Sequence, residues 1–363
     1  AEGFRIMVLS NAQWFANPGV VYEIDESCRF NDDDSARLTQ TFSSAPDSQK
    51  RFTCVFWLKR GGMDYQSISG AGVGATTGSI HMAINATGSL IFEVYHGSGW
   101  NSLGSTALYR DPSGWYQFMF VYDVDNATSG DRLRMWVNGT RVTNFATETQ
   151  PTSSIDHLCF SNTTEMEIGD DGDGAYFDGY LAQFVGLDGI AASDMSDFGE
   201  INSTTGQWVP KDVSGVTLGT NGFILDFADS SDLGNNAAST DGTNDWTPVN
   251  LAAADQMTDS PTDNYATINP LSFGTNTTSD VTFSEGNLKA LNGNSANRLN
   301  FFTSGIPTTG KWAWKVKILG ATLGGNNIIT FGFGSPGTAT PTDGNAIAGQ
   351  WNTMVTQAEC GYS

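Results

Sequence analysis

Residues 27–60 read SCRFNDDDSARLTQTFSSAPDSQKRFTCVFWLKR, and this stretch decides the fold. Its last part, from Arg51 to Leu58, alternates bulky and smaller side chains with a period of two and is rich in Phe, Val, Thr and Trp. Such a period is typical of a β-strand whose two faces pack differently. An acidic turn after Phe30 and a polar turn before Arg51 separate this strand from two earlier ones. The stretch therefore predicts three consecutive strands.

Further strands follow along the chain. The expected segments are Ser89–Tyr95, Trp115–Tyr122, Arg132–Val137, Arg141–Phe145, Met166–Ile168 and Phe177–Leu187. Asn138-Gly139 is a strong two-residue hairpin signal. No long apolar run with a helical period of 3.6 occurs, so the sequence predicts an all-β protein.

The charge of the chain limits what it can bind. It has 363 residues, with 17 basic and 39 acidic side chains and a net charge of −22. A polyanion would be repelled, and no basic stripe exists to release counterions, so nucleic acid is not an expected partner. Docking on anionic lipid is disfavoured for the same reason. No stretch of 18 apolar residues is present, which argues against membrane insertion.

The four cysteines, Cys28, Cys54, Cys159 and Cys360, are far apart and form no CxxC pair. The first three lie in or beside apolar strand patterns, where a thiol behaves as a small hydrophobic group. We therefore expect buried free thiols rather than zinc ligands or nucleophiles.

The order of several motifs resembles a known family. RFNDDDSARLTQTF, FTCVFWLKR, YRDPSGWYQFMFVYD, RLRMWVNGTRV and FDGYLAQFVGLDG occur in that order. Together they resemble the concanavalin A-like (laminin G-like) jelly-roll modules of bacteriophage tail and fibre proteins. GNLKAL and GKWAWKVKI resemble the start of a SPRY-type sandwich that follows such modules.

The resemblance implies an all-β chain with a concanavalin A-like jelly-roll sandwich followed by a second, SPRY-like β-sandwich. The expected divisions are an N-terminal attachment segment (1–25), the jelly roll (26–198), a connector packing on it (199–262) and the start of the SPRY-like sandwich (263–363). Few residues remain after Pro270. We expect either that the chain ends before the second sandwich does or that another chain completes it.

The function implied by the resemblance is that of a non-enzymatic virion structural or adhesion protein, in a tail fibre or similar appendage, that contacts host surface glycans. Other virion proteins and copies of the same chain would be its partners. It would be assembled in the host cytoplasm, whose reducing conditions suit unpaired cysteines, and be exposed outside the cell. Jelly rolls host several functions. A polysaccharide depolymerase, or a purely structural capsid decoration or filament subunit, remains an alternative.

The best candidate for sugar binding is a segment containing Tyr95, His96, Trp100 and Asn101. Sugar sites on jelly rolls pair an exposed aromatic ring, which stacks on a pyranose face, with neighbouring polar groups. Trp100 lies among small polar residues and outside any alternating pattern, which predicts a loop. The alternative is that Trp100 folds onto the core as a lid.

Calcium is the expected cofactor, if there is one, at Asp170, Asp171 and Asp173 in the sequence GDDGDG. Calcium takes several oxygen ligands and tolerates irregular geometry. Asn31–Asp34 and Asp123–Asn126 are similar candidates, and loops at one end of a sandwich could share an ion. Ordinary solvated turns are the alternative.

No catalytic residues are expected. Glu23, Asp25 and Glu26 resemble the glucanase pattern Glu-x-Asp-x-Glu, but the last Glu comes one residue too early to share the face of the others. Glu165 and Glu167 share a face without a third partner. His81, His96 and His157 form neither a catalytic nor a zinc-type arrangement, and we expect ordinary surface or strand positions.

Overall fold

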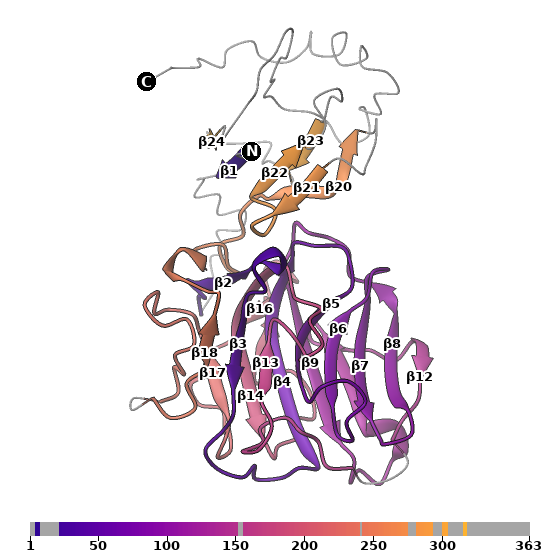
Figure 1. The fold of residues 1–363 in the computed structure, drawn as a ribbon. Helices are drawn as coiled ribbons and strands as arrows, with labels where there is room; N and C mark the ends of the chain where they lie inside the picture. Colours follow the sequence, from indigo (N-terminus) through magenta and orange to yellow (C-terminus); the bar gives the residue numbers. More distant parts are fainter. Residues whose placement is uncertain are drawn as a thin grey trace, which may run out of the picture.

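A computed structural model describes residues 4–7, 22–151, 155–239, 242–274, 281–292, 300–303 and 315–317. Their regular structure consists of β-strands and three short 3₁₀ helices, η1 (Asp32–Asp34), η2 (Ser129–Asp131) and η3 (Ala253–Asp255). The all-β prediction is therefore confirmed. Within the described residues, no helix is long and apolar enough to cross a membrane. Most strands form two antiparallel sheets of eight strands each (Figure 1).

The first of these, the β4 sheet, is built around the strand that the sequence made most prominent. Its strands in spatial order are β11 (Thr140–Arg141), β10 (Leu133–Val137), β9 (Tyr116–Asp123), β4 (Arg51–Arg60), β14 (Gly179–Asp188), β2 (Ser27–Phe30) and β19 (Gln256–Met257), with β17 (Phe223–Leu225) also paired to β14.

The second, the β7 sheet, faces it. Its strands in spatial order are β12 (Phe145–Glu148), β8 (Trp100–Leu108), β7 (Ser89–Tyr95), β6 (Ile80–Ile84), β5 (Gln66–Ala71), β13 (Met166–Ile168), β3 (Arg37–Gln40) and β18 (Thr247–Val249).

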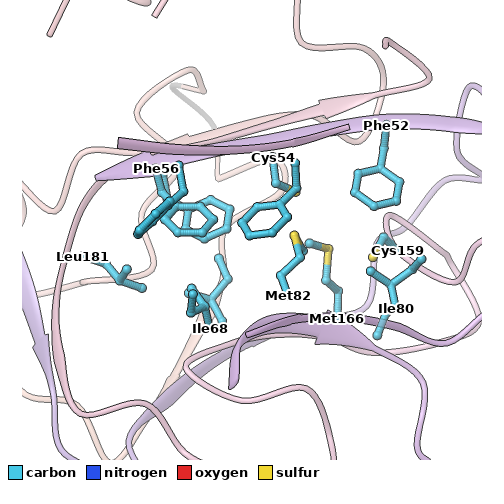
Figure 2. Packing of buried hydrophobic residues seen from close by; sticks show 14 of the residues in the cluster. Phe52, Cys54, Phe56, Ile68, Ile80, Met82, Cys159, Met166 and Leu181 are labelled. Carbon is cyan, nitrogen blue, oxygen red and sulfur yellow. The ribbon is translucent and has the colours of Figure 1, made fainter. Parts of the chain in front are cut away.

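The core lies between the two sheets. Figure 2 shows Phe52, Cys54 and Phe56 of β4 pointing toward Met82 and Met166 of the β7 sheet. All five side chains are fully buried. Burying each large apolar side chain contributes about 1.5–3 kcal/mol, so this layer is a major source of stability.

The three cysteines among the described residues are buried free thiols, as the sequence predicted. Cys28, Cys54 and Cys159 are buried and unpaired. Burial raises the pKa of each thiol, which keeps it protonated and unreactive. Cys360 lies outside the described residues.

A bulge allows β14 to serve two partners on one side. The pairing of β14 with β4 shifts by one residue between Ala182 and Val185. Within this bulge Gln183 has a φ of 43°. Before the bulge β14 pairs with β2, and after it with β17.

The segment 199–262 contributes strands to both sheets of the sandwich. β17 and β19 extend the β4 sheet, while β18 extends the β7 sheet. Phe223, Phe227 and Trp246 from this segment lie in the main core.

The outer face of the β4 sheet, which points away from the main core, is also buried. Val55, Val121 and Trp136 on this face pack with Phe198 and several other apolar residues from the chain after β14. Beside this cluster, Trp57 packs with Ile24 and Ala182, and partly buried Trp115 lies against them. Trp208, in the hairpin of β15 (Gly199–Ile201) and β16 (Trp208–Pro210), contacts both groups.

The C-terminal strands form two small sheets above the sandwich in Figure 1. One has the order β21 (Val281–Ser284), β22 (Lys289–Asn292), β1 (Phe4–Met7) and β24 (Lys315–Lys317), and the other pairs β20 (Ile268–Gly274) with β23 (Asn300–Thr303). The N-terminal strand β1 therefore pairs with strands from the far end of the chain. The expected strand at 328–333 lies outside the described residues.

Buried ion pairs connect the sandwich to the segments that follow it. Arg29 Nη2 lies 2.7 Å from Asp255 and 2.9 Å from Glu285 at the β21–β22 turn. Fully buried Lys59 donates from Nζ to Asp259 Oδ2 at 2.7 Å. Removing one partner of such a pair leaves an uncompensated buried charge, which costs about 3–5 kcal/mol.

Candidate functional site

The outer face of the β7 sheet carries polar and aromatic side chains at its centre. Along β7, buried core residues alternate with the partly exposed Ile91, Glu93 and Tyr95. The register places Glu93 beside His81 of β6, His81 beside Gly70 of β5, and Gly70 beside Glu167 of β13. A row of chemically active groups therefore crosses the sheet on the face away from the core.

The loop after β13 folds back over this row. A Cβ atom on Gly70 would lie only 2.7 Å from the Cβ of Asp171, so the missing side chain of Gly70 makes room for Asp171. Ser67 on β5 donates its hydroxyl to Asp171 Oδ2 at 2.5 Å. The glycine and the serine together hold the Asp171 carboxylate against the sheet, next to His81.

His81 is the centre of the cluster. Its imidazole Nδ1 lies 3.5 Å from Asp171 Oδ2, and Nε2 lies 3.7 Å from Asp173 Oδ2. His81 is only 7% exposed, yet Nε2 has no hydrogen-bond partner among the described residues. The imidazole is thus enclosed by two carboxylates without a close hydrogen bond to either.

Aromatic rings flank these acids. The Trp100 ring lies 4.5 Å from the His81 ring and 5.2 Å from Tyr95, measured between centroids. Tyr65 is 40% exposed. Burial raises the pKa of its phenol to about 12, with further contributions from nearby Asp171 and Glu93. The Tyr65 phenol is thus influenced by carboxylates of this face.

The structure brings three of the four residues predicted for sugar binding together. Trp100 begins β8 and is paired with Tyr95, so the expected loop shrinks to a short turn between the two strands. Trp100 lies on the outer face against His81 and is not part of the main core. It therefore does not fold onto the core as a lid. His96 stacks on Tyr95 at 6.5 Å. Asn101 takes the opposite side of β8 and donates to the carbonyl of Gln150.

The three aspartates predicted as calcium ligands have different roles. Asp171 and Asp173 approach His81, whereas Asp170 Oδ1 accepts the backbone N–H groups of Asp171 and Gly174 and closes the loop on itself. In the part of the chain that the structure describes, the three-residue group with metal-ligand geometry is His81, Asp171 and Asp173.

The two other acidic loops bond internally. In the first, Asn31 Nδ2 donates to Asp34 Oδ2 at 2.7 Å. In the second, Asn126 Nδ2 donates to Asp123 Oδ2 at 3.0 Å.

Sequence reasoning missed His81 and Tyr65. His81 lies in the segment IHMAI, whose alternation predicts that His81 and the core residues lie on opposite faces. Nothing local shows that residues about 90 positions later fold over it. Tyr65 precedes β5 in a turn and carries no pattern of its own.

The acids considered for catalysis are scattered. Glu23 and Asp25 are exposed, and Glu26 is partly buried. Glu165 is exposed, while burial and nearby Asp170 raise the pKa of Glu167 to about 7. Glu167 is also paired with Arg37, whose Nε lies 3.2 Å from it.

Comparison with known families matches the sandwich. The sequence profile described as the concanavalin A-like lectin/glucanases superfamily matches residues 31–187. The sandwich that contains this segment has a concanavalin A-like fold. The match covers strands of both sheets and the whole of the candidate site, from Tyr65 to Asp173. No match to the sequence of a curated protein was found.

Solved structures with a similar arrangement are distant. A heptameric SAP-like pentraxin from Limulus polyphemus is 15% identical, with a TM-score of 0.34 over 53% of this chain and 94% of that one. A putative carbohydrate-binding protein from Bacteroides ovatus is 15% identical, with a TM-score of 0.37 over 63% of this chain and 61% of that one. Domains LG4-5 of the mouse laminin alpha1 chain are 12% identical, with a TM-score of 0.35 over 50% of each chain. Likenesses this weak say nothing about activity.

Proposed function

We propose that this protein binds carbohydrate on the outer face of the β7 sheet. The observation that carries the proposal is the grouping of Trp100 and Tyr95 beside His81 and its acidic neighbours. Aromatic faces stack on the C–H faces of pyranose rings, and adjacent carboxylates accept hydrogen bonds from sugar hydroxyls. Membership of residues 31–187 in a superfamily that contains lectins supports the same function.

The charge of the face selects the class of glycan. Glu93, Asp171 and Asp173 lie together on a chain with a net charge of −22. Neighbouring Arg37 is paired with Glu167. With no cation bound, these carboxylates would repel sialic acids and uronic acids, so the ligand of the metal-free face is a neutral glycan.

A glycan array that contains neutral, sialylated and uronic-acid-containing saccharides tests both statements. We expect signals on neutral saccharides that Trp100→Ala abolishes. Leu108→Ala is the matched control, because Leu108 is another partly exposed apolar residue on β8, 50% exposed and about 26 Å away at about 3.3 Å per residue. Absence of any signal, or signals that Trp100→Ala leaves intact, would remove the proposal.

The biological setting we propose is a virion appendage, with the chain as a non-enzymatic adhesion subunit that forms oligomers with its own copies and contacts other virion proteins. The motif order of the jelly roll supports this setting, and the buried free cysteines suit assembly in a reducing cytoplasm. Mass spectrometry of purified particles and the mass of the purified chain in solution test the setting and the oligomer. A chain absent from particles, or monomeric at micromolar concentration, contradicts it.

Glu167 favours a second candidate, a polysaccharide depolymerase. A carboxyl group with a pKa of about 7 is suited to act as a general acid, and other carboxylates lie beside it. Release of reducing sugar from an array-positive polysaccharide, lost in Glu167→Gln, would establish this activity. Binding without release supports the non-enzymatic function.

A further inference from the structure

We propose that His81, Asp171 and Asp173 bind a divalent transition-metal ion of the zinc class. One donor atom from each residue lies within 4.8 Å of those of the other two. Metal binding at this position does not require that the face also binds glycan.

The unsatisfied imidazole nitrogen points to a ligand. His81 is only 7% exposed. Its Nε2 atom lies 3.7 Å from Asp173 Oδ2 and has no hydrogen-bond partner among the described residues. A buried nitrogen without a partner costs about 1–3 kcal/mol, and a metal ion would remove that cost. Two donors on a tetrahedral zinc ion lie about 3.4 Å apart, which is close to the distances seen here.

Neighbouring groups already fix the carboxylates in a suitable orientation. Asp173 Oδ1 accepts the backbone N–H of Gly74 at 2.9 Å, which leaves Oδ2 facing the imidazole. Asp171 Oδ1 accepts the backbone N–H of Asp173 at 3.2 Å, while Ser67 holds Oδ2 beside His81. Such supporting bonds orient metal ligands in known sites.

The donor set selects the metal. Calcium prefers six to eight oxygen ligands, and this group offers one nitrogen and two carboxylates. Imidazole combined with carboxylate suits zinc and its neighbours in the first transition row, with water in the remaining position. The calcium expected from the sequence is therefore replaced by a zinc-class ion, and His81 takes the place of Asp170.

Isothermal titration calorimetry of chelator-treated protein with Zn²⁺ tests the site. All samples carry Cys360→Ser, because a thiol outside the described residues could bind zinc by itself. We expect one zinc ion per chain, with affinity reduced at least tenfold in His81→Asn and in Asp173→Asn. His96→Asn is the matched control, a histidine near the same hairpin that is not in the cluster, and it should bind as the parent does.

Three results would overturn the proposal: no zinc binding at one ion per chain, equal affinity in His81→Asn and the parent, or calcium bound in preference to zinc. The Asp173 side chain lies in a loop and is 37% exposed, so its variant should fold even if His81→Asn does not; circular dichroism checks this. The zinc titration contains no saccharide. Its failure would therefore leave the glycan-array result unaffected, and the reverse also holds.

Discussion

The outer faces of the two sheets differ, and the difference locates the function. On the β4 sheet, Phe198, Met195 and Val213 cover the outward-pointing side chains, so β4 and β14 are buried on both faces. On the β7 sheet Glu93 and Trp100 remain partly exposed, and none of the described residues forms a comparable layer over them. One face is used for stability, and the other presents polar and aromatic groups to solvent.

This contrast separates two kinds of mutational effect. A side chain on the covered face should affect stability without affecting ligand binding. A side chain on the open face should do the opposite, because buried area rather than position in the sheet sets its contribution to folding.

Phe198→Ala should have the largest effect on stability. Phe198 is 1% exposed in the cluster over the β4 sheet. Loss of a buried Phe costs about 3–5 kcal/mol through lost burial and the cavity left behind. Urea unfolding measures the loss, and array signals at low temperature should persist. A loss below about 1 kcal/mol would mean that this layer does not cover the sheet.

Gly70→Ala should have the next largest effect, and it should lower both stability and zinc affinity. The added Cβ would lie 2.7 Å from Asp171 Cβ and 2.3 Å from the carbonyl oxygen of Ile80. Overpacking of this kind costs about 1–3 kcal/mol, and displacement of Asp171 should weaken zinc binding at least tenfold. Gly104→Ala is the control on the same sheet, since its Cβ would meet only ordinary contacts from 3.4 Å. Equal behaviour of the two variants would contradict the placement of the Asp171 loop.

Trp100→Ala should change stability by less than about 1 kcal/mol, because Trp100 is partly exposed and outside the core clusters. The measurement is the same urea titration used for Phe198→Ala. A loss comparable to that of Phe198→Ala would show that Trp100 is a packing residue.

Glu167→Gln should show its effect as a pH dependence of stability and not as lost packing. The folded-state pKa of Glu167 is about 7, against 4.5 ordinarily, chiefly because of burial. Between these values the unfolded chain loses the proton first, so stability falls as pH rises through this window and levels off above it. Melting temperatures at pH 5 and pH 8 should therefore differ less in Glu167→Gln than in the parent. Exposed Glu165→Gln is the control, and a parent that is more stable at pH 8 than Glu167→Gln would contradict the raised pKa.

The sequence predicted the all-β architecture but not the difference between the sheets. The alternation from Arg51 to Leu58 led us to expect two differently packed faces, whereas every residue of β4 after Arg51 is buried. Trp100 and the Asp171 loop were also recognisable, since each has a composition suited to binding.

The contact of both Trp100 and the Asp171 loop with His81 could not be predicted. It depends on the register across β5 and β6, which is shifted by an irregularity between Ser67 and Ser69, and on a loop that folds back over Gly70. The pairing of β1 with β22 is similarly non-local. Such contacts arise from tertiary packing and leave no periodic signal in the sequence.

The most direct test of the central claim is nuclear magnetic resonance of the tryptophan indole N–H groups, assigned by single Trp→Phe variants, during titration with an array-positive neutral saccharide. We predict that the Trp100 signal shifts in proportion to saturation while those of Trp57 and Trp136, on the covered face, do not move. Movement of the Trp136 signal with Trp100 unchanged would place the ligand on the β4 sheet and contradict this account.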